Sequence, residues 1–556
     1  MGLILVTLLA GCGKSESASS SPGDAKNQQV QNEPALSLHW AGMKRLSVEP
    51  TAAGFMRIWR LPETEKLKAR TLDKLALAPW QTGATNQTTI ISNYAALVQQ
   101  NHAASLLRPL LEDVVQDECY LEIRGAQATP AQVAVAIHLD AKRAAAWETD
   151  LAGVFGSKSN PHSKGASGGT NGGWQIQYTN KPAAKPVVKL AQLARFGDWT
   201  VIGFGPSQNA AFTELLTRAQ RNEFSSPAAA TKDWLQTTFD LRRLSKALDR
   251  DWDLPEEWPR VALNFTGNGS NVLTTGKLTF SKPLQAPIEP WNVPTNLIHE
   301  PVQSLTAVQG IGPWLASTRW WRDAHPGETP NQIFWWAQSG SPFLDYTAAP
   351  LQSASMMSKL GAAIMNSMNP VLSSNRMGRW ERVPGSDAIV WARAPIIKPF
   401  AGAIETGSKR FLFAGVSPQA VTNTPPPIST INDLKGSQNV VFFDREVTGP
   451  RVEAWMFMSQ LFRIILRREQ LPEGALTVAW LKAAGPSFGP ASTTSTRTSS
   501  TELAVSRSST IGLNSIELHL LADWLESPAF PFTLFSIVEK LPPPPTSRKA
   551  SGSGQK

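Results

Sequence analysis

Two stretches with the same spacing, Gly197–Ser207 (GDWTVIGFGPS) and Gly407–Ser417 (GSKRFLFAGVS), are the most informative part of the sequence for the fold. In each stretch a glycine precedes seven residues rich in apolar side chains, and a second glycine, one further residue and a serine follow. An apolar run bounded by turn-forming residues predicts a buried β-strand. The recurrence of the whole pattern later in the chain indicates an internal repeat.

Two further matches recur in the same order. Phe239-Asp240 ends the run WLQTTFD, and Phe443-Asp444 ends NVVFFD. Leu254-Pro255-Glu256 precedes Val261-Ala262 by the same spacing with which Leu471-Pro472-Glu473 precedes Val478-Ala479. Together the matches predict a tandem duplication, with a first half over residues 36–290 and a second half over residues 296–540.

Hydrophobic patterns predict helices and strands in blocks. We expect helices over residues 91–115, 141–155 and 353–368, and strands over 119–125, 132–140, 187–205, 387–396 and 409–416. Stretches dominated by Gly, Pro, Ser or Thr are expected to be loops without core residues, namely 157–173, 421–436 and 492–501. Because strands come in runs, the pattern predicts an α+β fold of two tandem related halves, each an antiparallel sheet packed with helices.

The N-terminal residues carry a short apolar run that ends at a cysteine. Leu3–Ala10 is too short to span a bilayer, which takes roughly 20 residues, but it has the length of a signal-peptide core. Leu9-Ala10-Gly11-Cys12 follows, and then a polar stretch without aromatic residues up to residue 35. This order resembles the lipobox of bacterial lipoproteins, in which the cysteine takes diacylglycerol and becomes the new N-terminus.

The resemblance implies a location rather than an activity. It implies a signal peptide over residues 1–11, lipidation of Cys12, and a flexible tether over residues 12–35 that would hold the body of the chain roughly 25 to 30 Å from its anchor. Gly13 is not the aspartate that favours retention in the inner membrane, so the expected location is the bacterial cell envelope, at the outer membrane. No Lys or Arg precedes the apolar run, which a translation start upstream of Met1 would explain.

Charge and cysteine content fit this location. The chain of 556 residues has a net charge of +9, which is compatible with contact to anionic lipid or an anionic envelope polymer. Part of the basic excess falls in the C-terminal tail, residues 541–556, which we expect to be disordered, and we expect no nucleic-acid partner. With Cys12 lipidated, Cys119 has no disulfide partner, and its apolar neighbours predict a buried, inert thiol.

The motifs that resemble catalytic or metal sites each lack a required part. Gly485–Gly489 (GPSFG) matches the G-x-S-x-G nucleophile elbow, but Pro490 and a Ser/Thr run follow where the elbow needs a helix. Asp249, Asp251 and Asp253 lack the Gly and Glu of a calcium loop, and the seven histidines have no zinc-binding spacing. We therefore predict no catalytic residue, no metal site and no cofactor.

Two expected strands carry a possible acid–base patch. Glu122 and Arg124 share the polar face of one expected strand, and His138 and Asp140 share a face of the next. A carboxylate beside an imidazole can move protons. An ordinary solvated sheet face explains the same pattern.

Tryptophan is the unusual residue of this sequence, with 20 in the chain. Five of them lie close together: Trp314, Trp320, Trp321, Trp335 and Trp336. Exposed indoles stack on sugars, anchor peptides or lie at lipid interfaces, whereas buried indoles pack a core. Neighbouring residues of a strand point to opposite faces, so one of Trp335 and Trp336 faces away from the core and needs a cover or a ligand.

A second apolar segment, Arg451–Arg468, allows two interpretations. It is either a core helix of the second half or a basic amphipathic helix at a membrane surface. For the whole chain we favour an envelope protein that acts by binding or scaffolding, with the five tryptophans as its candidate surface. The alternatives are a hydrolase acting on glycan or peptide, which needs paired carboxylates beside a tryptophan, and a lipid carrier, which needs a continuous apolar cavity.

Overall fold

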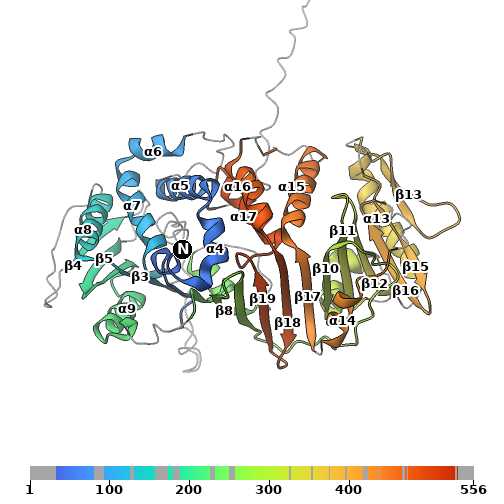
Figure 1. Ribbon diagram of the computed structural model, residues 1–556, viewed down its shortest axis with the longest axis horizontal. Helices are drawn as coiled ribbons and strands as arrows, with labels where there is room; N and C mark the ends of the chain where they lie inside the picture. The colour runs from blue at the N-terminus through green and yellow to red at the C-terminus, as the bar shows by residue number, and fades with distance from the viewer. Residues whose placement is uncertain are drawn as a thin grey trace, which may run out of the picture.

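All strands that the structure describes join one antiparallel sheet that runs the length of the molecule (Figure 1). The computed structural model describes residues 33–80, 93–125, 131–156, 173–179, 188–225, 232–248 and 257–535, the last range without 325–326, 328, 352, 354, 375, 395–396, 418–423, 438, 466–469, 472–473 and 533–534. The expected signal peptide, Cys12, most of the expected tether, the C-terminal tail and the three aspartates at 249–253 lie outside these residues.

Nine strands precede residue 280. They are β1 (Leu36–Trp40), β2 (Cys119–Arg124), β3 (Gln132–His138), β4 (Gly173–Thr179), β5 (Val188–Phe196), β6 (Trp199–Gly205), β7 (Leu235–Asp240), β8 (Arg260–Gly267) and β9 (Val272–Thr279). Across the sheet they follow the order β9-β8-β7-β1-β2-β3-β6-β5-β4, with every neighbouring pair antiparallel.

Ten strands follow residue 300. They are β10 (Val302–Gln309), β11 (Gln332–Gln338), β12 (Asp345–Leu351), β13 (Arg379–Arg382), β14 (Ile389–Ala392), β15 (Phe400–Thr406), β16 (Lys409–Gly415), β17 (Val440–Val447), β18 (Pro490–Arg497) and β19 (Glu502–Ser509). Their order is β19-β18-β17-β10-β11-β12-β16-β15-β14-β13. The two groups meet where β9 pairs with β19 over their full length.

The helices connect these strands. Between β1 and β2 lie α3 (Met43–Leu46), α4 (Ala53–Trp59), α5 (Pro62–Leu77), α6 (Tyr94–Gln100) and α7 (His102–Gln116), with the 3₁₀ helices η1 (Pro50–Ala52) and η2 (Ala78–Trp80). The others of the first group are α8 (Ala141–Gly156), α9 (Ala210–Gln220), η3 (Glu223–Ser225) and α10 (Leu241–Ala247). The second group has α11 (Gly312–Ser317), α12 (Arg319–Ala324), α13 (Ser355–Ser374), α14 (Ile428–Gly436), α15 (Thr448–Ile465), α16 (Leu476–Ala484), η5 (Gly485–Ser487) and α17 (Ser515–Glu526).

Side-chain alternation gives the sheet two different faces. Val133, Val135 and Ile137 of β3 pack into the core beneath α7 and α8, whereas Ala134 and Ala136 between them pack against α9. We call these the helix face and the opposite face. Strand register places α14 on the same opposite face as α9, and Figure 1 shows both at the lower side of the molecule, with α5, α15, α16 and α17 at the upper side.

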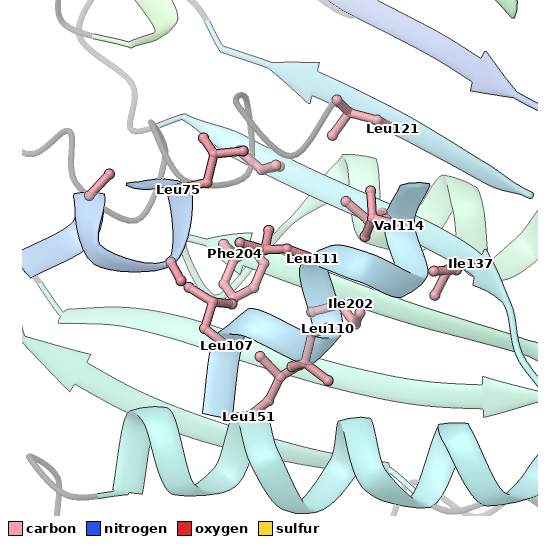
Figure 2. Packing of buried hydrophobic residues seen from close by; sticks show 14 of the residues in the cluster. Leu75, Leu107, Leu110, Leu111, Val114, Leu121, Ile137, Leu151, Ile202 and Phe204 are labelled. Atoms are coloured by element: carbon pink, nitrogen blue, oxygen red, sulfur yellow. The ribbon is translucent and has the colours of Figure 1, made fainter. Parts of the chain in front are cut away.

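The core of the N-terminal group forms around α7. Leu107, Leu110, Leu111 and Val114 follow the i, i+3, i+4, i+7 spacing of one helix face, and all are buried. Figure 2 shows them among Leu121, Ile137, Ile202 and Phe204 of the sheet. Side chains therefore fill the space between α7 and β2, β3 and β6.

Several sequence expectations are confirmed. Helices and one large antiparallel sheet form an α+β structure. Gly197 and Gly407 each lie in the turn of a hairpin, β5–β6 and β15–β16, with φ of +59° and +62° that favour glycine. Cys119 is fully buried, and burial raises the pKa of its thiol well above the ordinary value.

Other expectations were wrong. The helix expected over 91–115 is two helices in its described part, because the Asn101 side chain accepts a hydrogen bond from the amide of Ala104 and begins α7. The expected loop 492–501 contains most of β18, whose Thr493 is buried on the helix face because small hydroxyl side chains fit beneath α17. The expected loop 421–436 contains α14, which buries Ile431 and Leu434.

Two of the repeat matches do not fall on equivalent positions. Val261-Ala262 lies in strand β8, whereas Val478-Ala479 lies in helix α16. Phe239-Asp240 ends β7, whereas Phe443-Asp444 lies within β17. The glycine-bounded hairpins at 197 and 407 are the match that falls on the same kind of element at the same position.

Candidate functional site

The structure separates the five clustered tryptophans. Trp336 is fully buried, and Trp321 is 6% exposed in the contact of α12 with α13. Trp314 on α11 is 65% exposed, and Trp335 is half-buried. The side chain of Trp320 lies outside the part of the chain that is described. The segment thus supplies core residues and surface residues, so it is not a single tryptophan surface.

Trp335 and Trp336 point to opposite faces of β11, as strand geometry requires. On the opposite face, Trp336 has its ring 5.8 Å from that of Tyr346 and 5.9 Å from that of Phe413, within the core beneath α14. On the helix face, Trp335 meets the ring of Trp455 edge-on at 5.3 Å between centroids. Helix α15 therefore partly covers Trp335, the tryptophan that faces away from the core beneath α14.

Asp345, at the start of β12, ties this contact together. Its Oδ2 accepts a hydrogen bond from Arg451 Nη1 at 3.2 Å, and its Oδ1 accepts from Arg451 Nη2 at 3.0 Å and from Trp335 Nε1 at 3.2 Å. The guanidinium carbon of Arg451 lies 5.0 Å from the ring of Trp455. Arg451 and Asp345 neutralise each other's charge in this bidentate pair. The side chains around the pair that stay partly exposed are therefore aromatic.

A second aromatic pair joins α15 to the turn before β12. Phe343, in the turn before β12, meets Phe457 of α15 edge-on at 5.5 Å, and Phe457 is 50% exposed. We define the aromatic surface as Trp335, Trp455, Phe343 and Phe457. Its α15 members belong to the segment 451–468, in which Arg451 and Arg463 are buried, so the α15 part of that segment packs as a core helix with an exposed aromatic edge.

The two groups of strands differ in how well their helix face is covered. On β2 and β3, Leu121 and Val135 are each 1% exposed. On β11 and β12, the helix-face residues Ile333, Trp335 and Thr347 are half-buried, whereas Ala337 and Ala349 on the same face are buried. The connection between β1 and β2, residues 41–118, supplies α3 to α7, whereas the described part of the connection between β10 and β11, residues 310–331, supplies α11 and α12.

A buried carboxylate pair lies on the helix face of β17, and the sequence analysis missed it. Asp444 accepts a hydrogen bond from Thr306 Oγ1 at 2.7 Å, and Glu446 accepts from the amide of Ser515 at 2.7 Å at the N-terminus of α17. The pKa of Asp444 is raised to about 6, mainly by burial; the Thr306 hydrogen bond opposes the rise, and the charge of Glu446 adds to it. The i, i+2 spacing on one strand could have revealed this pair.

This pair does not meet the needs of a hydrolase. Asp444 is 5% exposed and Glu446 is 6% exposed beneath α17, so a glycan or peptide cannot reach them. The contacts of Glu446 instead hold the first turn of α17, where a negative charge is favourable. We interpret the pair as a structural anchor for that helix.

The remaining catalytic and metal candidates also fail on geometry. Gly485–Ser487 forms η5 at the end of helix α16, so the strand that a nucleophile elbow requires is absent there. Among the described residues, no group of three or more His, Cys, Asp and Glu is placed to hold a metal ion.

The patch of Glu122, Arg124, His138 and Asp140 does not form one site. Glu122 pairs with Arg124 at 2.8 Å, His138 lies edge-on to Trp199, and Asp140 accepts from the amide of Arg143 in the first turn of α8.

An imidazole–carboxylate pair that the sequence did not indicate lies on the opposite face. His39 Nε2 is 2.8 Å from Glu118 Oε1, and the His39 ring stacks on Tyr120 at 4.2 Å. The register of β1 against β2 brings these residues together across 79 positions of sequence, which no local spacing reveals. The described contacts place no Ser, Thr or Cys hydroxyl or thiol on this imidazole, so the pair lacks the nucleophile of a hydrolase.

A cleft of about 430 Å³ lies over α6, α7 and α8. Its lining includes Arg108, Glu112, Asp113 and Arg143, and these charges are paired: Arg108 with Asp73 at 2.8 Å, and Arg143 with Asp113. An open cleft lined by these ion pairs is not the continuous apolar cavity of a lipid carrier.

Comparison of the chain with protein-family models, with curated proteins and with solved structures finds no match. Within the described ranges, no helix combines the length and the apolar character needed to cross a membrane.

Proposed function

We propose that this chain is an exported, lipid-anchored envelope protein that acts by binding a partner on its aromatic surface. The location rests on the lipobox-like Leu9-Ala10-Gly11-Cys12 and the polar stretch after it. The binding role rests on one observation: two aromatic pairs, Trp335 with Trp455 and Phe343 with Phe457, leave aromatic side chains partly exposed, and Phe457 is 50% exposed. Clustered aromatic residues with a buried arginine at their centre are typical of binding hot spots.

The proposal includes a tandem duplication. Outward from β9 the strand order is β8, β7, β1, β2, β3, β6, β5, β4, and outward from β19 it is β18, β17, β10, β11, β12, β16, β15, β14. The strands of the two lists follow one another along the chain in the same order, except that β13 is inserted between β12 and β14. This agreement in order and connection supports two related halves, in which β2 corresponds to β11 and β3 to β12.

We expect the aromatic surface to be occupied in the cell. Thr347 lies beside Trp335 in the register of β11 and β12 and is half-buried on the same face. A Thr347→Cys variant in a Cys119→Ser background should react with N-ethylmaleimide at least fivefold more slowly in intact cells than as purified protein, because a bound partner shields the thiol. Quantitative mass spectrometry of the labelled cysteine measures both rates.

The matched control is Thr275→Cys, which places a thiol at an exposed position of β9 on the opposite face. Its reaction rate should be the same in cells and in purified protein. Addition of Trp335→Ala should abolish the shielding of the cysteine at 347. Equal rates at both positions in wild-type surroundings would refute a partner at the aromatic surface.

Lipid anchoring has its own test. Bacteria that express the chain and grow with an alkyne fatty acid should incorporate the label into the wild-type protein, and Cys12→Ser should lose the label and move the protein from the membrane to the soluble fraction. Cys119→Ser is the control, because Cys119 is buried and is the chain's other cysteine. If the Cys12→Ser protein stays labelled, the lipobox assignment is wrong.

A further inference from the structure

We propose that two copies of this chain associate through strand β4, which lies at an open edge of the sheet and pairs with β4 of the second copy as its antiparallel neighbour across a two-fold axis. The pairing does not involve the aromatic surface, so it goes beyond the proposed function. Three observations carry it: the position of β4 in the sheet, the composition of the strand, and the way its sequence matches itself.

Strand β4 ends the sheet on the side of the first group of strands. It pairs with β5 over all seven of its residues, from Gly173 opposite Ala194 to Thr179 opposite Val188. Figure 1 shows β4 at the left end of the molecule. In an antiparallel ladder every second residue of an edge strand directs its N–H and C=O groups outward. Among the described residues, no strand or backbone hydrogen bond meets these groups of β4, and such a row is a template for a further strand.

The other end of the sheet carries the protection that β4 lacks. Under the proposed duplication β14 corresponds to β4, and β13 pairs with the outer side of β14. Strand β13 has only four residues, RWER, and Arg379, Glu381 and Arg382 are charged. Short edge strands with charged residues resist pairing with another chain. Strand β4 is longer, and its sequence GWQIQYT contains no charged residue and no proline.

The sequence of β4 fits a second copy of itself. In an antiparallel pair centred on Ile176, Trp174 of one copy stands opposite Tyr178 of the second copy. Gln175 stands opposite Gln177 in the same register. Aromatic residues in opposite positions stabilise a sheet, and this register opposes no like charges. The two-fold axis repeats each pair, so one strand supplies a closed interface. Strands β9 and β19 already join the two halves by antiparallel pairing over eight residues.

Charge substitutions test the pairing by sedimentation velocity of the full mature chain carrying Cys12→Ser, which we expect to be a dimer. Gln175→Lys with Gln177→Lys should weaken the dimer roughly tenfold, because the register then opposes lysine to lysine twice. Gln175→Lys with Gln177→Glu should restore the dimer, because each lysine then stands opposite a glutamate. The matched control, Thr275→Lys with Ser492→Lys, adds two charges at exposed positions of β9 and β18 and should leave the dimer unchanged.

Single cysteines test the register. Gln175 is exposed, so a cysteine there is accessible to oxidant. Gln175→Cys and Gln177→Cys, each with Cys12→Ser and Cys119→Ser, should form a disulfide between copies when the two variants are mixed and oxidised. Opposite Cα atoms lie about 4.5 to 5.5 Å apart, which a disulfide can bridge. Either variant alone should cross-link far less, because its cysteines then lie on a diagonal of about 7 to 8 Å. Non-reducing electrophoresis measures the cross-linked fraction.

Each outcome supports or overturns the inference. A chain that stays monomeric at every concentration, or a dimer that the two lysines leave intact, would rule out pairing through β4. A Lys–Glu variant that stays monomeric, or a single cysteine variant that cross-links as well alone as in the mixture, would rule out the antiparallel register and the proposal with it. None of these results bears on the aromatic surface, because the labelling of Thr347→Cys does not depend on β4.

Discussion

Replacing Glu526 with glutamine should lower the free energy of unfolding by about 3 to 5 kcal/mol, because it removes the anion from a buried cluster of two cations. The Glu526 side chain is 1% exposed at the end of α17, and it accepts hydrogen bonds from Arg70 of α5 and Thr477 of α16. Lys74 of α5 donates to the carbonyl oxygens of Leu525 at 2.7 Å and Ser527 at 3.1 Å. The amide variant keeps the size of the side chain, so the loss reports charge.

The same cluster should give the protein a pH-dependent stability. The pKa of Lys74 is lowered from its ordinary 10.5 to about 7, mainly by burial and also by the charge of Arg70, while Glu526 acts in the opposite direction. Between pH 7 and pH 10 the unfolded chain therefore binds a proton at Lys74 that the folded chain has released. Stability rises with pH where the unfolded state binds more protons, so the free energy of unfolding should increase over this range.

Urea denaturation at pH 6, 7.5 and 9 measures both effects. The rise with pH should begin at a lower pH in Glu526→Gln, because the anion that supports charged Lys74 is gone, and Lys74→Met should abolish it. Glu502→Gln is the matched control: Glu502 pairs with Lys277 at 3.4 Å across β19 and β9, but at the surface, and its loss should leave the denaturation midpoint almost unchanged. Equal midpoints for Glu526→Gln and wild type would contradict the buried-cluster argument.

This cluster matters because it joins segments that are far apart in the sequence. Ile58 and Leu67 near the start of the chain share a core with Trp480 and Leu518 near its end. The β9–β19 pairing continues the same junction through the sheet. The junction is therefore held by backbone pairing, by apolar contact and by a buried charge cluster, so we expect the whole sheet to unfold as one cooperative unit.

The sequence correctly predicted those helices, strands and turns that are determined by residues only a few positions apart. Gly197 and Gly407 marked their hairpin turns because a positive φ excludes most other residues there. Apolar and polar side chains alternate along β2 and β3, and apolar residues form a stripe along α8. Both patterns are local, so the sequence alone predicted these elements. The α+β class follows from such local signals, since runs of strands without helices between them form antiparallel sheets.

The errors arose where packing overrides composition. The Ser/Thr run at 492–501 looks like a loop, but the neighbours of β18 on both sides satisfy its backbone, and its hydroxyl groups fit on a half-buried face. Residues 476–484 (LTVAWLKAA) satisfy a strand pattern as well as a helix pattern, and contact with α17 and α5 selects the helix α16. Short apolar runs are ambiguous in this way.

The candidate site was predictable in part. Alternation along β11 showed that Trp335 and Trp336 must face opposite ways, but it could not show that α15, more than 100 residues later, brings Arg451 and Trp455 over Trp335. The buried acids Asp444 and Glu446 and the pair of His39 with Glu118 likewise depend on contacts between distant strands and helices. Sequence patterns reveal which face a side chain takes, and tertiary contacts decide what meets it there.

Trp336→Ala should be the most destabilising single truncation within the five clustered tryptophans. The ring is completely buried between Tyr346 and Phe413, so its removal leaves a large cavity in the core beneath α14 and should cost about 3 to 5 kcal/mol. Trp335→Ala removes a half-buried ring and one hydrogen bond to Asp345, and should cost about 1 to 2 kcal/mol. Urea denaturation of the two variants at one pH compares these costs directly.

Because Trp336 is fully buried and Trp335 is half-buried, the two variants also distinguish an effect on stability from an effect on binding. Trp336→Ala should reduce the amount of folded protein, yet the fraction that folds should still shield a cysteine at position 347 in cells, because the helix face is intact. Trp335→Ala should fold with nearly wild-type yield and lose that shielding, because the aromatic surface loses its central ring. If Trp335→Ala instead retains the shielding while it unfolds as readily as Trp336→Ala, then Trp335 is a core residue, and the aromatic surface is part of the packing rather than a place where a partner binds.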